Sequence, residues 1–174
     1  MTPVTRTVIT ALLACLAGEL FRMTAGISMV HVPYRASQLA TLSVMAGESD
    51  LMFSNIQPAM PAIRGGRLRP LGISSAKRSA LLPDTGTIEE LGLPGFHVEQ
   101  LYGILAPAGT PRDIVRRLNG EAAKAAQSDE MRERLRAEGS EVRVSTPEEF
   151  EKVIAAEIRQ WTKVIRQAGI TDAQ

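Results

Sequence analysis

The stretch MVHVPYRASQLATLSVMAGESDLMFSN, residues 29–55, holds the pattern that decides the fold. It contains two short apolar runs, Met29–Pro33 and Leu51–Phe53, and each ends in small or polar turn residues. Both runs are too short for a helix of ordinary length, whereas the segment between them is long enough to form one. This arrangement is typical of buried strands joined by a helix. The stretch therefore predicts a strand–helix–strand unit of an α/β fold.

Further apolar runs continue this pattern along the chain. Residues 71–73 and 101–106 have similar lengths and flanks, and we expect both to be strands. The later spacing of apolar residues predicts helices over 111–127, 129–138 and 147–167, with a short strand over 141–144 between the last two. These amphipathic helices need a sheet to cover their apolar stripes. They pack either on the sheet formed within residues 30–106 or in a second domain whose sheet is absent.

Three threonine and acid pairs of the Thr-x-x-acid type predict where helices begin. In such a pair the threonine hydroxyl accepts from an early N–H of the helix, and the acid reaches back to the N–H of the threonine. The pairs are Thr87 with Glu90, Thr110 with Asp113, and Thr146 with Glu149. Proline follows two of the threonines, at positions 111 and 147, where the first helical residue needs no N–H donor.

Polar residues follow the two strands of the opening stretch. In open α/β sheets ligands bind at the carboxyl ends of the strands. Hydroxyls, an amide and the N–H groups of helix N-termini together suit a small anion such as a carboxylate. A phenol and a guanidinium at a strand end can both meet a carboxylate, so Tyr34 and Arg35 are the strongest candidates. The predicted ligand-binding residues are Tyr34, Arg35, Ala36, Ser37, Ser54 and Asn55. An exposed turn without a ligand is the alternative.

Composition narrows the range of functions. The 174 residues carry 20 Lys and Arg against 19 Asp and Glu, so the net charge of +1 gives no electrostatic case for nucleic acid or an anionic membrane. One cysteine and two histidines leave little material for a disulfide framework, a metal site or a histidine-dependent triad. We expect His31 and His97 to be structural. From the sequence we expect no cofactor, no metal ion and no enzymatic activity. A role as an effector-sensing regulatory domain is disfavoured, because the sequence shows no DNA-binding segment.

The N-terminal residues allow two interpretations. Residues 8–17 are apolar or small and resemble a short secretory signal, with small side chains where a signal peptidase cuts. Residues 12–15 also resemble a bacterial lipobox, in which case Cys15 would be the acylated first residue. Alternatively, residues 8–23 form the first helix of the domain. No segment reaches the roughly 18 to 20 apolar residues that a transmembrane helix needs.

Several ordered blocks of this sequence resemble one family. They are HVPYR at 31–35, GESDLMFSN at 47–55, PAIRGGRLR at 61–69, SSAKR at 74–78 and YGILAPAGTP at 102–111. In this order they resemble the Bug family, the extracytoplasmic solute receptors of bacterial tripartite tricarboxylate transporters. The similarity runs from AGELF at 17–21 to AGI at 168–170. By position, residues 34–37 correspond to a Tyr-Lys-Gly-Gly turn of that family, and residues 54–55 to its Asp-Asn turn.

The resemblance implies an architecture, a ligand class and a location. The fold would be α/β and of the type II periplasmic-binding-protein kind, in which two lobes close around a small carboxylic acid and present it to membrane permease subunits from the periplasm. This chain would hold one complete lobe plus the C-terminal helices of an incomplete second lobe. Its parts would be a signal-like or first-helix leader at 1–17, the ligand-binding lobe at 18–107, which is the second lobe of the family, and helices of the first lobe at 108–174.

One departure from the family leaves a second hypothesis open. Family members carry a long first-lobe segment before the block at 17–21, and this segment is absent here, with Cys15 about where the family has a histidine. The first hypothesis is a receptor that captures a small carboxylic acid. The second is a shortened remnant without ligand binding, which acts as a structural domain or self-associates through exposed helix faces.

Overall fold

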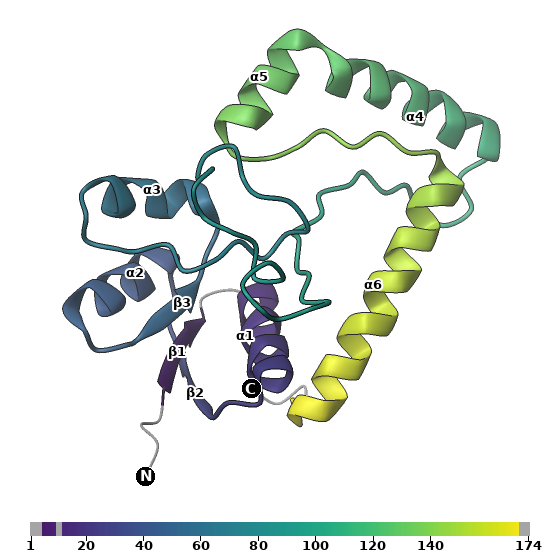
Figure 1. Ribbon diagram of the computed structural model, residues 1–174. Coiled ribbons are helices and arrows are strands. Elements are labelled where there is room, and N and C mark those ends of the chain that lie inside the picture. The colour runs from purple at the N-terminus through teal and green to yellow at the C-terminus, as the bar shows by residue number, and fades with distance from the viewer. Residues whose placement is uncertain (1–4, 10–11, 171–174) are drawn as a thin grey trace. The chain divides into compact units, whose positions relative to one another are not determined.

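The computed structural model describes residues 5–9 and 12–170 of the chain, with side chains from residue 14 onward. The chain divides into two compact units, whose elements are labelled in Figure 1. Unit 1 comprises Met1–Gln100 and Gln167–Gln174, and unit 2 comprises Leu101–Arg166. Among the described residues, all strands belong to unit 1.

Unit 1 is built on a parallel three-stranded sheet with the order β2-β1-β3. Its strands are β1 (Thr5–Ile9), β2 (Met29–Pro33) and β3 (Leu51–Phe53). The prediction of strands at 29–33 and 51–53 is confirmed. Thr7 of the central strand lies opposite His31 on one side and Leu51 on the other. Because all three strands are parallel, their carboxyl ends meet at one edge of the sheet.

The N-terminal segment contributes the central strand of this sheet. The predicted helix over 8–23 is wrong at its start, because residues 8 and 9 belong to β1 and the helix α1 spans Leu12–Ala25. Leu16 and Ala17 of α1 are buried. Residues 1–4 and 10–11 of the predicted leader lie outside the described residues, and the processing of residues 1–17 stays a prediction.

Two helices connect and follow the outer strands. Helix α2 (Ser37–Ala46) links β2 to β3, as the sequence predicts, and α3 (Ile56–Arg64) follows β3. The C-terminus of α2 is closed by Gly47, whose φ of 75° lies in the left-handed region that glycine enters without steric cost. In this arrangement each outer strand leads directly into the N-terminus of a helix.

An aromatic cluster joins three parts of unit 1. The ring of Phe21 from α1 meets the rings of Phe53 and Phe96 at centroid distances of 5.8 Å each, both in edge-to-face geometry. Phe96 is 1% exposed. Aromatic pairs of this geometry stabilise a core beyond the area that they bury. Phe96 therefore fixes the irregular segment after α3 onto the helix and the sheet.

The predicted strand at 71–73 is wrong. Ile73 makes an isolated parallel bridge with Thr87, in which the N–H of Ile73 donates to Gly86 O at 2.9 Å. The backbone at Gly72 approaches the side chains of Ile88 and Leu91 so closely that a Cβ there would lie 2.9 Å from Ile88 Cγ1. This segment packs against a turn rather than a strand, because no neighbouring strand within the described residues continues the ladder.

Unit 2 contains three helices among the described residues. They are α4 (Arg112–Gln127), α5 (Asp129–Ala137) and α6 (Pro147–Ala168). These bounds agree with the predicted helices to within one residue at each end. The predicted strands at 101–106 and 141–144 are wrong, since both segments are extended but pair with no strand in the described part of the chain. A strand is stable only with a hydrogen-bonding neighbour, and unit 2 provides none for them.

The three predicted capping pairs have different outcomes. Thr146 and Glu149 form the reciprocal pair at the start of α6, with Thr146 N–H donating to Glu149 Oε2 at 2.8 Å. Thr87 and Glu90 form the same pair but close a turn, so the predicted helix start there is wrong. Thr110 instead donates through Oγ1 to Pro107 O at 2.8 Å, and α4 has no side-chain cap. The Thr-x-x-acid pattern therefore predicts the local hydrogen bonds but does not by itself show that a helix follows.

Candidate functional site

The carboxyl edge of the sheet in unit 1 brings the predicted ligand-binding residues together. Tyr34, Arg35 and Ala36 form the turn from β2 to α2, while Ser54 and Asn55 form the turn from β3 to α3. The strands β2 and β3 flank β1, so the two turns are separated by about 10 Å, which is two strand spacings. Both turns lie at one end of the sheet in Figure 1. Residues 10–11, which follow β1, lie outside the described residues.

Two helix N-termini face this edge without side-chain caps. The N-cap residues are Ala36 for α2 and Asn55 for α3, and the described side chains at these positions donate or accept no capping hydrogen bond. The first N–H groups of an α-helix have no partner inside the helix and carry a partial positive charge. Both helices therefore present backbone donors that suit an anionic group, as the sequence predicts for this edge.

The phenol of Tyr34 is held by the fold. Its hydroxyl donates to Ser43 Oγ at 2.7 Å, and Ser43 Oγ lies 2.9 Å from Ser49 Oγ. Both serines are buried. This chain of hydroxyls ties the β2–α2 turn to the far half of α2 and to the turn before β3. In the structure Tyr34 thus positions the turn, and its hydroxyl proton is used in the bond to Ser43 rather than offered at the edge of the sheet.

Sequence reasoning did not single out Ser43 and Ser49. Ser43 lies in an apolar part of α2, between Leu42 and Val44. A serine among apolar residues was the one feature of the sequence that could have indicated a buried hydroxyl. A buried hydroxyl needs a hydrogen-bond partner, so a serine on a buried helical face points to a nearby polar group. The partner could not be named without the fold, because Tyr34 and Ser49 approach it from different elements.

The other predicted residues are accessible from solvent. Arg35 is exposed, and among the described residues it makes no ion pair or hydrogen bond, so its guanidinium can meet a carboxylate. Ser37 opens α2, and its carbonyl accepts from Thr41 Oγ1 at 3.0 Å. Ser54 is exposed and donates through Oγ to Asn55 O at 3.0 Å. The edge thus offers one cation, backbone N–H donors and the exposed amide of Asn55.

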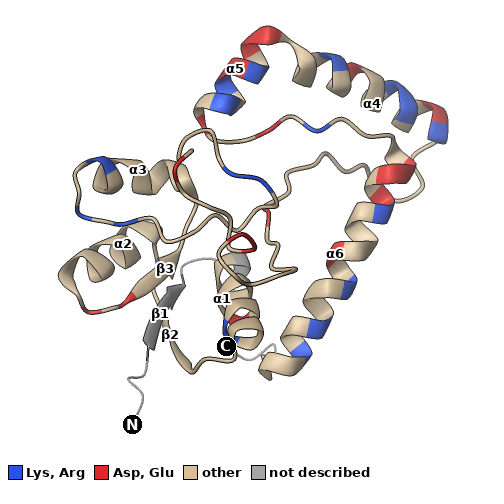
Figure 2. Cartoon of the chain, in the orientation of Figure 1, with Lys and Arg blue, Asp and Glu red and all other residues tan. Residues whose placement is uncertain are grey.

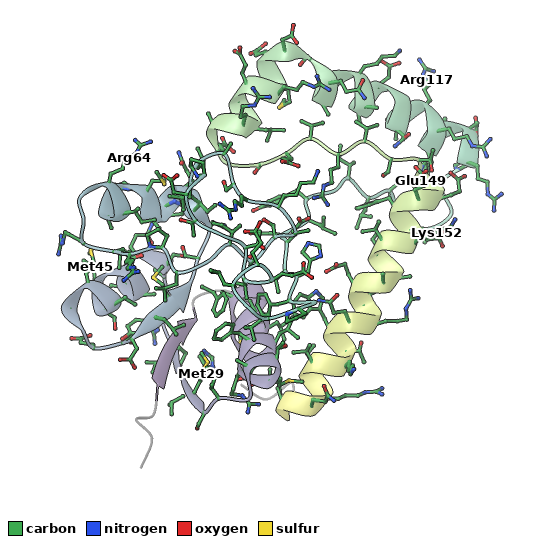
Figure 3. All side chains as sticks on the ribbon, in the orientation of Figure 1. Met29, Met45, Arg64, Arg117, Glu149 and Lys152 are labelled. Atoms are coloured by element: carbon green, nitrogen blue, oxygen red, sulfur yellow. The ribbon has the colours of Figure 1, made fainter. Side chains whose placement is uncertain are left out.

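Positive charge collects at the C-terminal end of α3 and in the chain that follows it. Between Leu51 and Pro83 the chain carries no Asp or Glu but five basic residues, namely Arg64, Arg67, Arg69, Lys77 and Arg78. All five are exposed, as expected for a solvated face. Figure 2 shows basic residues at the C-terminal end of α3 and in the loop after it, and Figure 3 shows Arg64 there. Arg78 is paired with Glu90 at 2.9 Å. Segregated positive charge attracts anionic ligands over distances near the Debye length.

The remaining titratable candidates form no reactive set. Burial raises the pKa of the Cys15 thiol above its ordinary value, and the Glu19 carboxylate raises it further, which favours the unreactive thiol. His97 is exposed beside Glu99, with 3.1 Å between Nε2 and Oε1, and His31 is exposed on β2. Within the described part of the chain, no three His, Cys, Asp or Glu side chains gather closely enough to hold a metal ion.

A parallel sheet with helix N-termini at its carboxyl edge is the arrangement at which open α/β folds bind ligands. A family model described as the tripartite tricarboxylate transporter family receptor matches residues 9–170. The chain belongs to this family. It is 37% identical, over 86% of its length, to a UPF0065 protein of the tcbD–tcbE intergenic region from Pseudomonas sp. strain P51, and 33% identical, over 90%, to BugT of Bordetella pertussis. The chain spans about half the length of these relatives, 45% and 48%.

Solved structures show the same fold. Rpa4515 of R. palustris, described with adipate, has a TM-score of 0.81 at 32% identity, and the similarity covers 97% of this chain and 57% of that one. MatC of Rhodopseudomonas palustris, with bound malate, has a TM-score of 0.72 at 28% identity over 92% and 56% of the two chains. The predicted fold class is confirmed. It is α/β of the type II periplasmic-binding-protein kind, with one complete lobe and the C-terminal helices of a second, incomplete lobe.

Proposed function

We propose that this chain is an extracytoplasmic solute-binding receptor that captures a small carboxylic acid for a tripartite tricarboxylate transporter. The observation that carries the proposal is the carboxyl edge of the sheet, where two uncapped helix N-termini and the exposed Arg35 lie together. Family membership supports it, and so do the related structures described with adipate and malate. Adipate and malate are both dicarboxylic acids, which is the chemistry that such an edge accommodates.

Each group at this edge has a role in the proposal. One carboxylate oxygen accepts from the first N–H groups of α2 near Ser37, and a carboxylate near Asn55 accepts from those of α3. The guanidinium of Arg35 forms a charge-assisted hydrogen bond to the ligand. Tyr34 holds the turn through Ser43 and does not need to touch the ligand. Capture is completed when two lobes close on the acid, and the non-enzymatic receptor then presents it to the permease subunits.

The domain assignment and the location are part of the same proposal. We assign residues 18–107 to the ligand-binding lobe of the family, to which the structure adds the central strand β1 at Thr5–Ile9, and residues 108–174 to helices of its other lobe. The location is the periplasm, and none of the described helices is long and apolar enough to cross a membrane. Lipid attachment at Cys15 as a first residue requires removal of residues 1–14, which include the central strand β1. A lipidated Cys15 and a folded β1 therefore exclude each other.

Calorimetric titration with a panel of small mono- and dicarboxylic acids, adipate and malate included, tests this function. One acid is expected to bind and to raise the melting temperature of the chain by mass action. Replacing Arg35 by Ala is expected to weaken that binding about tenfold or more, because a charge-assisted hydrogen bond contributes roughly 1.5 to 3 kcal/mol.

Arg64→Ala provides the matched control for this titration. Arg64 is also an exposed arginine of unit 1, but it lies at the other end of α3, about 12 Å along the helix axis. Binding should stay within about twofold in this variant, since bulk charge is screened over such a distance. Equal losses in both variants would mean that the charge acts only at long range, and a panel without any binder would contradict the receptor function.

A second candidate is that the chain binds no ligand and self-associates. The observation in its favour is the number of large apolar side chains of unit 2 that are exposed, among them Tyr102, Ile104, Leu105 and Leu118. Contiguous exposed apolar surface marks interaction sites in soluble proteins. Light scattering of the purified chain, with and without the acids, separates the two candidates. A dimer that binds no acid favours the second.

A further inference from the structure

Four basic residues form one line along helix α6 of unit 2. We call this line the basic row; it consists of Lys152, Arg159, Lys163 and Arg166. Because an α-helix turns about 100° and rises about 1.5 Å per residue, the four positions fall within about 60° of its circumference and span about 21 Å along its axis. All four are exposed. Figure 2 shows basic residues distributed along this helix.

The apolar face of α6 lies on the opposite side of the helix. Val164 is buried, and the ring of Phe150 lies so close to Gly103 that a Cβ there would collide with it. By helical spacing, both side chains start about 130° to 170° around the helix from the middle of the basic row. Glu157 also lies on that far side, where it accepts from Trp161 Nε1 at 2.7 Å. The basic row is therefore not part of the packed face.

The chain itself does not neutralise the basic row. Among the described residues, Arg159, Lys163 and Arg166 form no ion pair or hydrogen bond, and Lys152 interacts only with the charge of Glu149. Residues 158–170 contain no Asp or Glu. Like charges three or four residues apart destabilise a helix. The helix dipole favours Arg166 in the last turn but not the cations before it, so an anionic partner would remove a repulsion that the fold leaves in place.

The surroundings of the basic row favour an acidic helix over a membrane surface. Glu148 lies four residues before Lys152 and continues the same line with a carboxylate, which a flat anionic surface would also meet. Ala155 and Ala156 occupy this face between Lys152 and Arg159, so it has no large apolar side chain to insert into lipid. Small side chains let a partner backbone approach. Carboxylates three and four residues apart on a helix repeat with a pitch of about 5.4 Å, which matches the row.

We propose that the basic row of α6 is a docking surface for a partner protein that presents a helix with a line of carboxylates. The two arginines can each accept a carboxylate in a two-pronged hydrogen bond, and the two lysines add point charges. Because all four groups are exposed, the association is steered by charge and weakened by salt. The surface belongs to unit 2, so the proposal goes beyond the receptor function and stands whether or not the sheet edge of unit 1 binds an acid.

Binding of a labelled peptide to the full chain tests this docking. The probe is an alanine-rich peptide, held helical by a hydrocarbon staple, with glutamates three and four residues apart on one face. Its control has glutamine at the same positions. Fluorescence anisotropy at low salt is expected to show at least about tenfold tighter binding of the glutamate peptide. This difference should shrink strongly at about 1 M salt, where charges are screened beyond about 3 Å.

The double variant Arg159→Glu, Lys163→Glu reverses the charge in the centre of the basic row. It is expected to weaken binding of the glutamate peptide by about tenfold or more, because attraction is replaced by repulsion. Both side chains are exposed, so folding should stay intact, and circular dichroism verifies this.

The double variant Arg117→Glu, Arg132→Glu is the matched control. It changes the net charge by the same amount through exposed arginines of α4 and α5 in the same unit, and Figure 3 shows Arg117 on α4. Its binding should stay within about threefold of the wild type. Equal binding of the two peptides, or equal losses in the two double variants, would overturn the proposal. So would binding of phosphatidylglycerol vesicles through Arg159 and Lys163 in place of the peptide, which would assign the row to a membrane surface.

Discussion

Units 1 and 2 contain apolar runs of the same kind, yet only unit 1 turns them into a sheet. The run Met29–Pro33 becomes β2 because β1 lies beside it with a matching register. The run 101–106 stays extended and unpaired, because unit 2 holds no described strand beside it. An apolar strand pattern in the sequence therefore shows that a segment can form a strand. Whether the strand forms depends on a neighbouring strand with which its backbone can pair.

The two units also differ in how they bury their side chains. In unit 1 the ring of Phe96 is fully buried, and the buried Ser43 accepts a hydrogen bond from the Tyr34 hydroxyl. In unit 2, polar contacts such as the Thr146 and Glu149 pair fix the helices, while large apolar side chains are exposed. The stability of unit 1 should therefore depend on packing, and that of unit 2 on helix ends and local pairs.

Phe96→Ala should produce the largest effect on this difference. Removing a buried aromatic ring from a core costs about 3 to 5 kcal/mol of unfolding free energy. The loss should appear in the far-ultraviolet circular dichroism transition, to which unit 1 contributes. Trp161, the only tryptophan, lies in unit 2, and its fluorescence transition should change little. If the fluorescence transition moves by the same amount, the units unfold together and the comparison fails.

Ser43→Ala should have an intermediate effect, confined to unit 1. The change leaves the Tyr34 hydroxyl and the buried Ser49 hydroxyl without their shared partner. An unsatisfied buried polar group costs about 1 to 3 kcal/mol, measurable by urea denaturation. Ser75→Ala removes an exposed hydroxyl that donates to Lys77 O, and it should cost less than about 0.5 kcal/mol. Equal costs for the two variants would contradict the buried role of Ser43.

The smallest effect concerns pH at the two capping pairs. Hydrogen bonds from Thr146, first from its backbone N–H and then with its side chain, and the nearby charge of Lys152 lower the pKa of Glu149 below its usual 4.5. A carboxyl whose pKa is lower in the folded state stabilises that state above the unfolded pKa, and this contribution disappears as the pH falls through the folded pKa. Figure 3 shows Glu149 and Lys152 near the start of α6.

Hydrogen exchange of the Thr146 amide measures this pH dependence. Protection of the amide should fall when the pH drops from neutral to below 4.5, and Glu149→Gln should remove most of that change. In unit 1, the Thr87 N–H and the Arg78 guanidinium lower the pKa of Glu90 in the same way. The Thr87 amide closes a turn packed on Ile73, so its protection should change less. A larger change at Thr87 would reverse the expected ranking of the two units.

The sequence predicted the elements with strong local signals. The helices of unit 2 were located to within one residue at each end, because the spacing of their apolar side chains is local information. The strands at 29–33 and 51–53 were located for the same reason. The N-terminal strand β1 was missed, because the run of small and apolar residues from Val8 onward fits a helix or a signal equally well. Its role in the sheet depends on β2 and β3.

The sequence predicted where the candidate site lies but not what each of its residues does. Turn residues after parallel strands indicate the carboxyl edge of a sheet, so all six residues could be named in advance. The assignment of the Tyr34 hydroxyl to Ser43 required the fold, because the two residues belong to different elements and are nine positions apart. The residues of the site remain a prediction until the titration with Arg35→Ala is made.

The sequence by itself determined the family, the helix boundaries of unit 2 and the two turns that meet at the sheet edge, since each depends on residue types at short spacing. Only the tertiary structure decided which apolar runs become strands, which capping pairs start helices and which hydroxyls are bound within the fold. The physical reason is that strand ladders, buried hydroxyl pairs and aromatic contacts each need a partner that lies far away in the sequence. Helix periodicity and turn chemistry are complete within a few residues.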